Sequence, residues 1–269
     1  METKMSTRVL MDASGVAISP KVLSKDVVVK QGELSFKDAS VLFYKQTSLK
    51  GKTIIFDGDS ITEENFRSAR PWHKYLMDWY GFTDINVGVS GTGLVKPSGN
   101  KVGAIARLPN YTTDCDAYVF MGNMNDGTSS GGISTIGTKG STDTSTLYGA
   151  IKVFFDALIE KYPLKPLLMI SSSPRSQVGT LGKCYGSDAW FAEWVKVWRE
   201  MCTDYGIAFL DLYSEIGGLR PWNDENNLEY FSPDGTGSGS YSADGIHPNS
   251  KGHLIMARYV SSFIVDNIY

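Results

Sequence analysis

Cysteine is scarce in this sequence, and neither sign of charge is in marked excess. The 269 residues include only three cysteines, Cys115, Cys184 and Cys202, which are widely spaced and match no metal-binding pattern. Buried free thiols are therefore the expected state, and the redox compartment stays open. The formal net charge is -3 and no cluster of lysine or arginine stands out, so nucleic acid is not an expected partner.

Long hydrophobic runs are missing as well. No stretch approaches the roughly 20 apolar residues of a membrane-spanning helix. Residues 1–5 lead into no apolar segment of the kind found in signal peptides. We therefore expect no membrane span, and a location that is cytoplasmic, non-classically exported or associated with a virion.

Composition places the chain among ordinary globular proteins. Hydrophobic residues make up 42% and charged residues 20% of it, and its length allows one large domain with an appendage. Residues 1–49 are the expected appendage, because their short β-leaning runs at 27–29 and 41–44 hold too little apolar surface for a core. We expect this arm to serve in attachment or oligomerisation, packing on the main domain, residues 50–269, or on a second copy.

Short apolar runs alternate with helical patterns from residue 52 onward. Strands are predicted where the runs look buried on both faces, at residues 53–56, 84–89, 117–121, 166–171 and 207–212. Helices are predicted where apolar residues recur at helical spacing, at 147–162, at 190–201 and after 249. This alternation predicts an α/β protein with a five-stranded parallel sheet and helices on both faces.

Four unusual segments follow these strands. The triplet Gly58-Asp59-Ser60 ends the first, glycine-rich segments at 88–93 and 122–127 follow the second and third, and a loop with Asp244 and His247 follows the fifth. Ligands of parallel sheets bind outside the carboxyl ends of the strands, so we expect all four to converge on one rim. A serine, a histidine and an aspartate gathered there contain every part of a nucleophile, base and orienter set.

These segments resemble the SGNH (GDSL-type) hydrolase family of serine esterases. The resemblance covers residues 51–265 and is carried by four blocks, at residues 58–62, 86–91, 125–126 and 244–247. The Asp-Gly-Ile-His-Pro-Asn run of the last block is its most specific piece. The resemblance implies a three-layer, flavodoxin-like α/β fold.

It also implies a role for particular residues in these blocks. Ser60 would be the nucleophile, His247 the base and Asp244 the orienter. The Ser60 and Gly91 amides and the Asn125 side chain would form the oxyanion hole. An imidazole that takes the serine proton raises the rate by about 10² to 10⁴, and each oxyanion donor contributes about 10² to 10³. This mechanism implies no metal and no organic cofactor.

Two other histidines compete with His247 for the role of base. His73 is expected on a surface helix, and His253 lies just inside the last helix, where capping or packing is expected. Asp59 is interpreted as a structural turn residue rather than a second acid.

The third block departs from the family pattern. The family reads Gly-x-Asn-Asp, whereas an extra residue here produces Gly-Asn-Met-Asn-Asp at 122–126. Either Asn123 or Asn125 could therefore face the oxyanion, and the following Asp126 favours Asn125.

Long loops at the expected rim bear on the substrate. Residues 128–145 are rich in glycine, serine and threonine, and the excursion at 212–243 carries four aromatic residues, Trp222, Tyr230, Phe231 and Tyr241. Polar walls with aromatic rings suit a sugar better than a fatty acyl chain, although aromatic residues in a loop serve packing as often as binding. The expected function is an O-acetyl esterase acting on carbohydrate, in a small molecule or a polysaccharide, with a lipase or thioesterase as the alternative.

Two interpretations come from other classes of protein. An apolar strand followed by Asp57 and Asp59 also fits haloacid-dehalogenase-type phosphatases, with Asp57 as nucleophile and a magnesium ion, but the later acidic pair and lysine of that class are not found. Residues 10–20 resemble the leaders of phage and prophage tail proteins. This second resemblance implies an adhesin or tail module with a secondary esterase site, and an N-terminal arm that attaches or oligomerises.

Overall fold

The fold is described from a computed structural model. It describes residues 49–63, 66–122, 125–127, 132–133, 135–174, 188–216, 219, 224–236 and 242–268. The arm expected at residues 1–49 therefore lies, except for Leu49, outside the described residues, and so does Cys184. The other two cysteines are free and buried, as expected.

A five-stranded parallel sheet forms the centre of the molecule. Its strands run in the order β2-β1-β3-β4-β5 and all neighbours pair in parallel. Their bounds are β1 Thr53–Asp57, β2 Thr83–Asn86, β3 Ala117–Met121, β4 Leu167–Ile170 and β5 Ala208–Leu210. The five strands and the α/β class predicted from the sequence are confirmed, although β2, β4 and β5 are shorter than expected.

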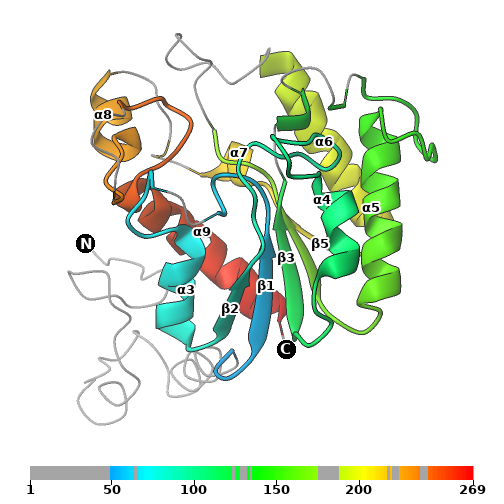
Figure 1. Cartoon of the computed structure of the whole chain (residues 1–269), viewed down its shortest axis with the longest axis horizontal. Coiled ribbons are helices and arrows are strands. Elements are labelled where there is room, and N and C mark those ends of the chain that lie inside the picture. Colours follow the sequence, from blue (N-terminus) through cyan, green and yellow to red (C-terminus); the bar gives the residue numbers. More distant parts are fainter. Residues whose placement is uncertain are drawn as a thin grey trace, which may run out of the picture.

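Helices cover both faces of the sheet and complete three layers (Figure 1). One face carries α3 Trp72–Tyr80 and α9 Ser250–Asn267, which pack on each other. The other carries α4 Ala104–Arg107, α5 Leu147–Lys161 and α6 Asp188–Tyr205. No helix of the described residues is long and apolar enough to cross a membrane.

The central strand β3 contributes side chains to two hydrophobic cores, one on each face of the sheet. Tyr118 and Phe120 belong to the core beneath α5 and α6, whereas Val119 and Met121 belong to the core beneath α3 and α9. Successive side chains of a strand point to opposite faces, so an uninterrupted apolar run supplies both layers. Burial on both faces holds the carboxyl end of the strand at the rim.

The excursion at residues 212–243 is not one long loop. It contains two helices, α7 Leu212–Glu215 and α8 Asp224–Phe231. The Phe231 side chain is fully buried in the core beneath α9, and Tyr230 packs against the same core. Of the two roles open to the aromatic residues of this segment, packing or binding, Phe231 therefore has the packing role. Trp222 and Tyr241 lie outside the described residues.

Candidate active site

Ser60 lies in a tight turn directly after β1. The turn is held by the Asp59 side chain, which accepts a hydrogen bond from the Ile61 amide at 3.0 Å, and by the Asp59 carbonyl, which accepts from Thr62 and Glu63. Position 58 favours glycine, because a Cβ there would lie 2.6 Å from the Thr62 hydroxyl. The buried strand and this turn together place Ser60 at the edge of the sheet where the carboxyl ends of the strands lie.

The Ser60 hydroxyl meets a histidine and an aspartate from the far end of the chain. Its Oγ lies 2.9 Å from His247 Nε2, and His247 Nδ1 lies 2.7 Å from Asp244 Oδ2. The imidazole thus bridges the hydroxyl and the carboxylate. This is the order of contacts in which a base takes a proton from a nucleophile while a carboxylate fixes its tautomer.

The loop before α9 supplies both Asp244 and His247. Asp244 Oδ1 accepts hydrogen bonds from the Ile246 and His247 amides, at 2.8 and 2.9 Å, and Gly245 adopts a positive φ of 65°. Asn249 then caps α9, accepting from the Gly252 amide at 3.1 Å. The three-residue offset between carboxylate and imidazole is therefore closed by one turn that leads directly into a capped helix.

Donors other than His247 also hold the Asp244 carboxylate. Arg67 Nη1 lies 2.8 Å from Oδ2, the same oxygen that contacts His247. Burial alone would raise the pKa of the Asp244 carboxyl, but the hydrogen bonds and charge of His247 and the two loop amides lower this pKa below its usual value. The carboxylate is therefore ionised at neutral pH. Sequence reasoning missed Arg67, because 177 residues separate it from Asp244.

Gly91 lies in the turn after β2, close to the turn that carries Ser60, the nucleophile predicted from the sequence (the nucleophile turn). Its φ is 75°, and a Cβ there would lie 2.6 Å from the Ser98 hydroxyl, so the position requires glycine. Within the described part of the chain, the Gly91 amide donates to no other group. Glu63 holds the preceding residue, because its carboxylate accepts from both the amide and the hydroxyl of Ser90.

Asn125 follows β3 and lies between the turns that carry Ser60 and Gly91. Its Nδ2 donates to the Thr92 carbonyl at 3.0 Å and to Asp59 Oδ2 at 3.3 Å. Asn123, the alternative oxyanion residue, lies outside the described residues. The structure thus brings one of the two candidate asparagines beside the nucleophile turn.

Asp126 holds the backbone that follows the Gly91 turn. Its buried carboxylate accepts hydrogen bonds from three successive backbone amides, those of residues 94–96. A side chain on Gly93 would collide with this carboxylate. The two residues of the Asn-Asp pair in the third block therefore have different contacts. Asn125 faces the nucleophile turn, and Asp126 fixes the backbone of the neighbouring loop.

His73 and His253 occupy buried positions behind the site. His73 lies on α3, but the expected surface position is wrong: the ring is fully buried, 2.8 Å from Asp84 Oδ2 and 3.0 Å from the Thr62 carbonyl. His253 lies in α9 as expected, and burial lowers its pKa to about 3. Its Nδ1 accepts from the Trp72 amide at 3.3 Å, so it packs between helices.

Asp57 has the surroundings of a structural carboxylate. It is fully buried and accepts hydrogen bonds from Arg107 at 2.8 Å and Tyr118 at 2.7 Å. Arg107 also donates to the Thr92 hydroxyl at 2.9 Å, which ties the base of the nucleophile turn to the Gly91 turn. A carboxylate enclosed in this way has no path to a phosphate ester, so the phosphatase interpretation loses its nucleophile.

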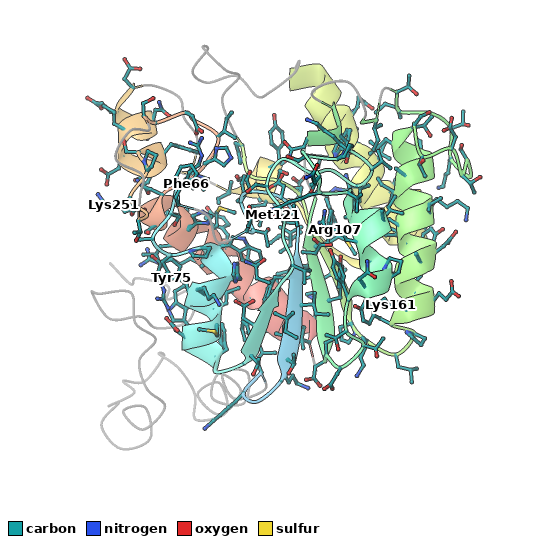
Figure 2. All side chains as sticks on the ribbon, viewed as in Figure 1. Phe66, Tyr75, Arg107, Met121, Lys161 and Lys251 are labelled. Atoms are coloured by element: carbon teal, nitrogen blue, oxygen red, sulfur yellow. The ribbon has the colours of Figure 1, made fainter. Side chains whose placement is uncertain are left out.

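Figure 2 labels Met121 at the carboxyl end of β3, and the Arg107 guanidinium pairs with Asp57 at the carboxyl end of β1. This is the edge of the sheet where the Ser60 and Gly91 turns leave their strands. In the described part of the chain, no three His, Cys, Asp or Glu side chains are grouped so that they could hold a metal ion.

A narrow recess opens at the Ser60 hydroxyl. Ser60, His247, Glu63 and Arg67 line it, and it encloses about 10 Å³, roughly the space of one water molecule. A larger, open hollow of about 550 Å³ adjoins it, sharing Ser68 and Pro71 with the recess. The ring of Phe66, which is 37% exposed, lines this hollow. A small polar recess therefore lies next to a wider hollow that α3 borders.

Sequence comparison places residues 56–255 in one family model, described as the GDSL-like lipase/acylhydrolase family. The match runs from the last residues of β1 into α9 and includes Ser60, Gly91, Asn125, Asp244 and His247. No curated protein sequence matches this chain significantly.

Solved structures share the fold across most of the chain. A protein from Lactobacillus plantarum is 24% identical with a TM-score of 0.65, and the match covers 82% of this chain and 99% of that one. A candidate GDSL-like lipase from Bacteroides uniformis is 17% identical, with a TM-score of 0.54 and coverage of 80% and 96%. A carbohydrate acetylesterase family member from Sinorhizobium meliloti is 16% identical, with a TM-score of 0.52 and coverage of 81% and 99%.

Proposed function

Because this chain belongs to the GDSL-like lipase/acylhydrolase family, we propose that it is a serine esterase that hydrolyses carboxylic esters through an acyl-enzyme. One observation carries the proposal: Ser60 Oγ, the His247 ring and Asp244 Oδ2 are joined in series by contacts of 2.9 and 2.7 Å. A serine hydroxyl is a weak nucleophile until a neutral imidazole within hydrogen-bond reach takes its proton. That condition is met at this distance.

In the acylation step, Ser60 Oγ attacks the ester carbonyl carbon while its proton passes to His247 Nε2. The imidazolium is stabilised by Asp244, whose contact with Nδ1 fixes the ring. Collapse of the tetrahedral intermediate breaks the bond to the alcohol, which leaves with the proton from Nε2. A water molecule then repeats the sequence on the acyl-serine and releases the acid.

Negative charge develops on the carbonyl oxygen in both steps. We assign its stabilisation to the Ser60 and Gly91 amides and to Asn125 Nδ2. The Gly91 amide supports this assignment, because it donates to no group among the described residues. The Asn125 amide stands beside both turns, and one of its present hydrogen bonds, to Asp59, is long at 3.3 Å.

The character of the recess favours an O-acetyl esterase acting on carbohydrate. Glu63 and Arg67 line the recess beside the nucleophile, and a long apolar acyl chain would strip water from both charges. A methyl group covers far less of them. The adjoining open hollow, with the Phe66 ring and polar side chains, has room for a sugar. The Sinorhizobium meliloti protein of the same fold is a carbohydrate acetylesterase family member.

The proposal is tested with p-nitrophenyl acetate, butyrate and palmitate, acetylated xylan and acetylated sialic acid. We expect acetyl esters to be preferred. Ser60→Ala and His247→Ala should each remove nearly all hydrolysis, and the double variant should be little worse than either, because the two side chains act as a unit. Full activity in Ser60→Ala, or losses that simply multiply, would contradict the serine mechanism. A palmitate preference would move the substrate to the lipase class.

A further inference from the structure

We propose that Arg67 is a positioning residue that locks the Asp244 carboxylate against His247 and sets the acid limit of the pH–activity profile. This inference rests on the proposed esterase function. No motif contains Arg67, and it comes to the site from the segment between the nucleophile turn and α3.

The contacts of the Asp244 carboxylate carry the first part of the inference. Oδ2 contacts both Arg67 Nη1, at 2.8 Å, and His247 Nδ1, at 2.7 Å, while Oδ1 accepts from two loop amides. Four donors hold two oxygens, so the carboxylate cannot rotate away from the imidazole. Arg67 is the only one of these donors that belongs to a different part of the chain.

The location of Arg67 makes its charge relevant to the proton on His247. Its side chain is 21% exposed and lines the recess that also contains Ser60 and His247. A guanidinium stays charged throughout the working pH range. It shares the Asp244 oxygen with the imidazole, so it offsets part of the attraction between the carboxylate and an imidazolium.

Other charged groups face His247 as well. Asp244 contacts it, and Glu63 lines the same recess, with its carboxylate 3.3 Å from Lys101 Nζ. His253 lies behind it in α9, and burial keeps that ring neutral, with a pKa of about 3. Asp244 and Glu63 thus place two negative charges at the recess, and Arg67 contacts the carboxylate that is bonded to His247. This arrangement of charges is why the loss of Arg67 should move the acid limb of the activity profile.

The test replaces Arg67 with glutamine in the full-length protein. We expect the acid limb of kcat/KM for p-nitrophenyl acetate to move to higher pH by about one unit, because a positive charge close to the imidazole is lost. At the plateau, kcat should fall about 3- to 10-fold with KM unchanged, since Asp244 is less firmly held. Arg67→Lys should keep the wild-type midpoint while losing part of kcat, because it retains the charge but not the planar fork.

Lys251→Gln is the matched control. Lys251 lies at the start of α9, where Figure 2 labels it, and pairs with Glu229 at 2.8 Å. The variant removes one positive charge near the His247 loop without touching Asp244, and it should leave the acid limb in place. An equal shift in both variants would mean that total charge, not the Arg67 contact, sets the limit.

A second measurement separates this inference from the esterase proposal. The titration of the His247 ring is followed by NMR in the Ser60→Ala protein, with and without Arg67→Gln. A higher midpoint in the double variant supports the role of Arg67 whether or not the wild type hydrolyses esters. An unchanged midpoint in a folded protein overturns it, even if the serine mechanism holds.

Discussion

Asn125 shows how a single amide can link two turns of a site. It bonds the Thr92 carbonyl at 3.0 Å, one residue beyond Gly91, and Asp59 at 3.3 Å, one residue before Ser60. The side chain therefore holds the two proposed oxyanion amides in register while standing next to them. A neutral amide in this place neither repels the developing anion nor pairs permanently with it.

Replacing this side chain tests its assignment. Asn125→Ala should lower kcat by about 10² to 10³ with little change in KM, because an oxyanion contact strengthens only in the transition state. Asn123→Ala should have a much smaller effect. The measurement is steady-state hydrolysis of p-nitrophenyl acetate by both variants. The opposite ranking would transfer the oxyanion role to Asn123.

At the scale of elements, a buried ion pair joins α3 to β2 behind the site. Asp84 Oδ2 lies 2.8 Å from His73 Nδ1 and 2.9 Å from Lys74 Nζ, and the His73 and Asp84 side chains are fully buried. Burial alone would raise the pKa of Asp84, but the hydrogen bonds and charges of His73 and Lys74 lower this pKa below its usual value of 3.8. His73 also contacts the Thr62 carbonyl, so the pair supports the loop after the nucleophile.

This pair predicts a pH-dependent contribution to stability. A carboxyl with a lowered folded-state pKa stabilises the fold above its unfolded pKa, and the contribution is lost as the pH falls through the folded value. Asp84→Asn should therefore lower the free energy of unfolding by about 3 kcal/mol at neutral pH, with a gap from wild type that closes below about pH 4. Urea unfolding across a pH series measures this gap.

An exposed pair provides the control. Asp156 pairs with Lys152 one turn away on α5, at 2.6 Å. Asp156→Asn should change the free energy of unfolding by no more than about 0.5 kcal/mol, because solvent screens an exposed pair. An equally small effect for Asp84→Asn would show that the buried contact adds nothing to the stability of α3 on β2.

At the scale of the whole molecule, we make a proposal about the N-terminal arm, whose residues precede the described fold. Leu49 is fully buried in the core beneath α3 and α9, so the hydrolase domain begins no later than this residue. Among the described residues, the other members of both cores lie between Ile54 and Ile268. We propose that residues 1–48 serve attachment or oligomerisation rather than completing a core.

Deleting residues 1–48 tests this division of the chain. We expect the shortened protein to stay folded and to hydrolyse p-nitrophenyl acetate at a rate close to wild type, but to change its oligomeric state or its association with a larger assembly. Circular dichroism, steady-state kinetics and light scattering after gel filtration measure these properties. Loss of the soluble fold would show instead that the arm completes the core.

Local patterns in the sequence determined the sheet, the main helices and the order of the functional segments. Apolar runs buried on both faces placed all five strands, and the segments after them were expected to converge on one rim. The roles of Gly91 and Asn125 came from the family resemblance of these segments. These features depend on neighbours within a few residues, where backbone preferences and periodicity act directly. The Asp244 turn belongs to the same class, because its carboxylate caps amides only two and three residues away.

Only the tertiary structure decided which distant side chains meet. Arg67 reaches Asp244 across 177 residues, and Arg107 reaches Asp57 across 50, and no local periodicity signals either contact. The burial of His73 was predicted wrongly for the same reason, because elements distant in the sequence cover its side chain. Pairing between charges far apart in the chain depends on how the layers pack, which is set by the whole core at once.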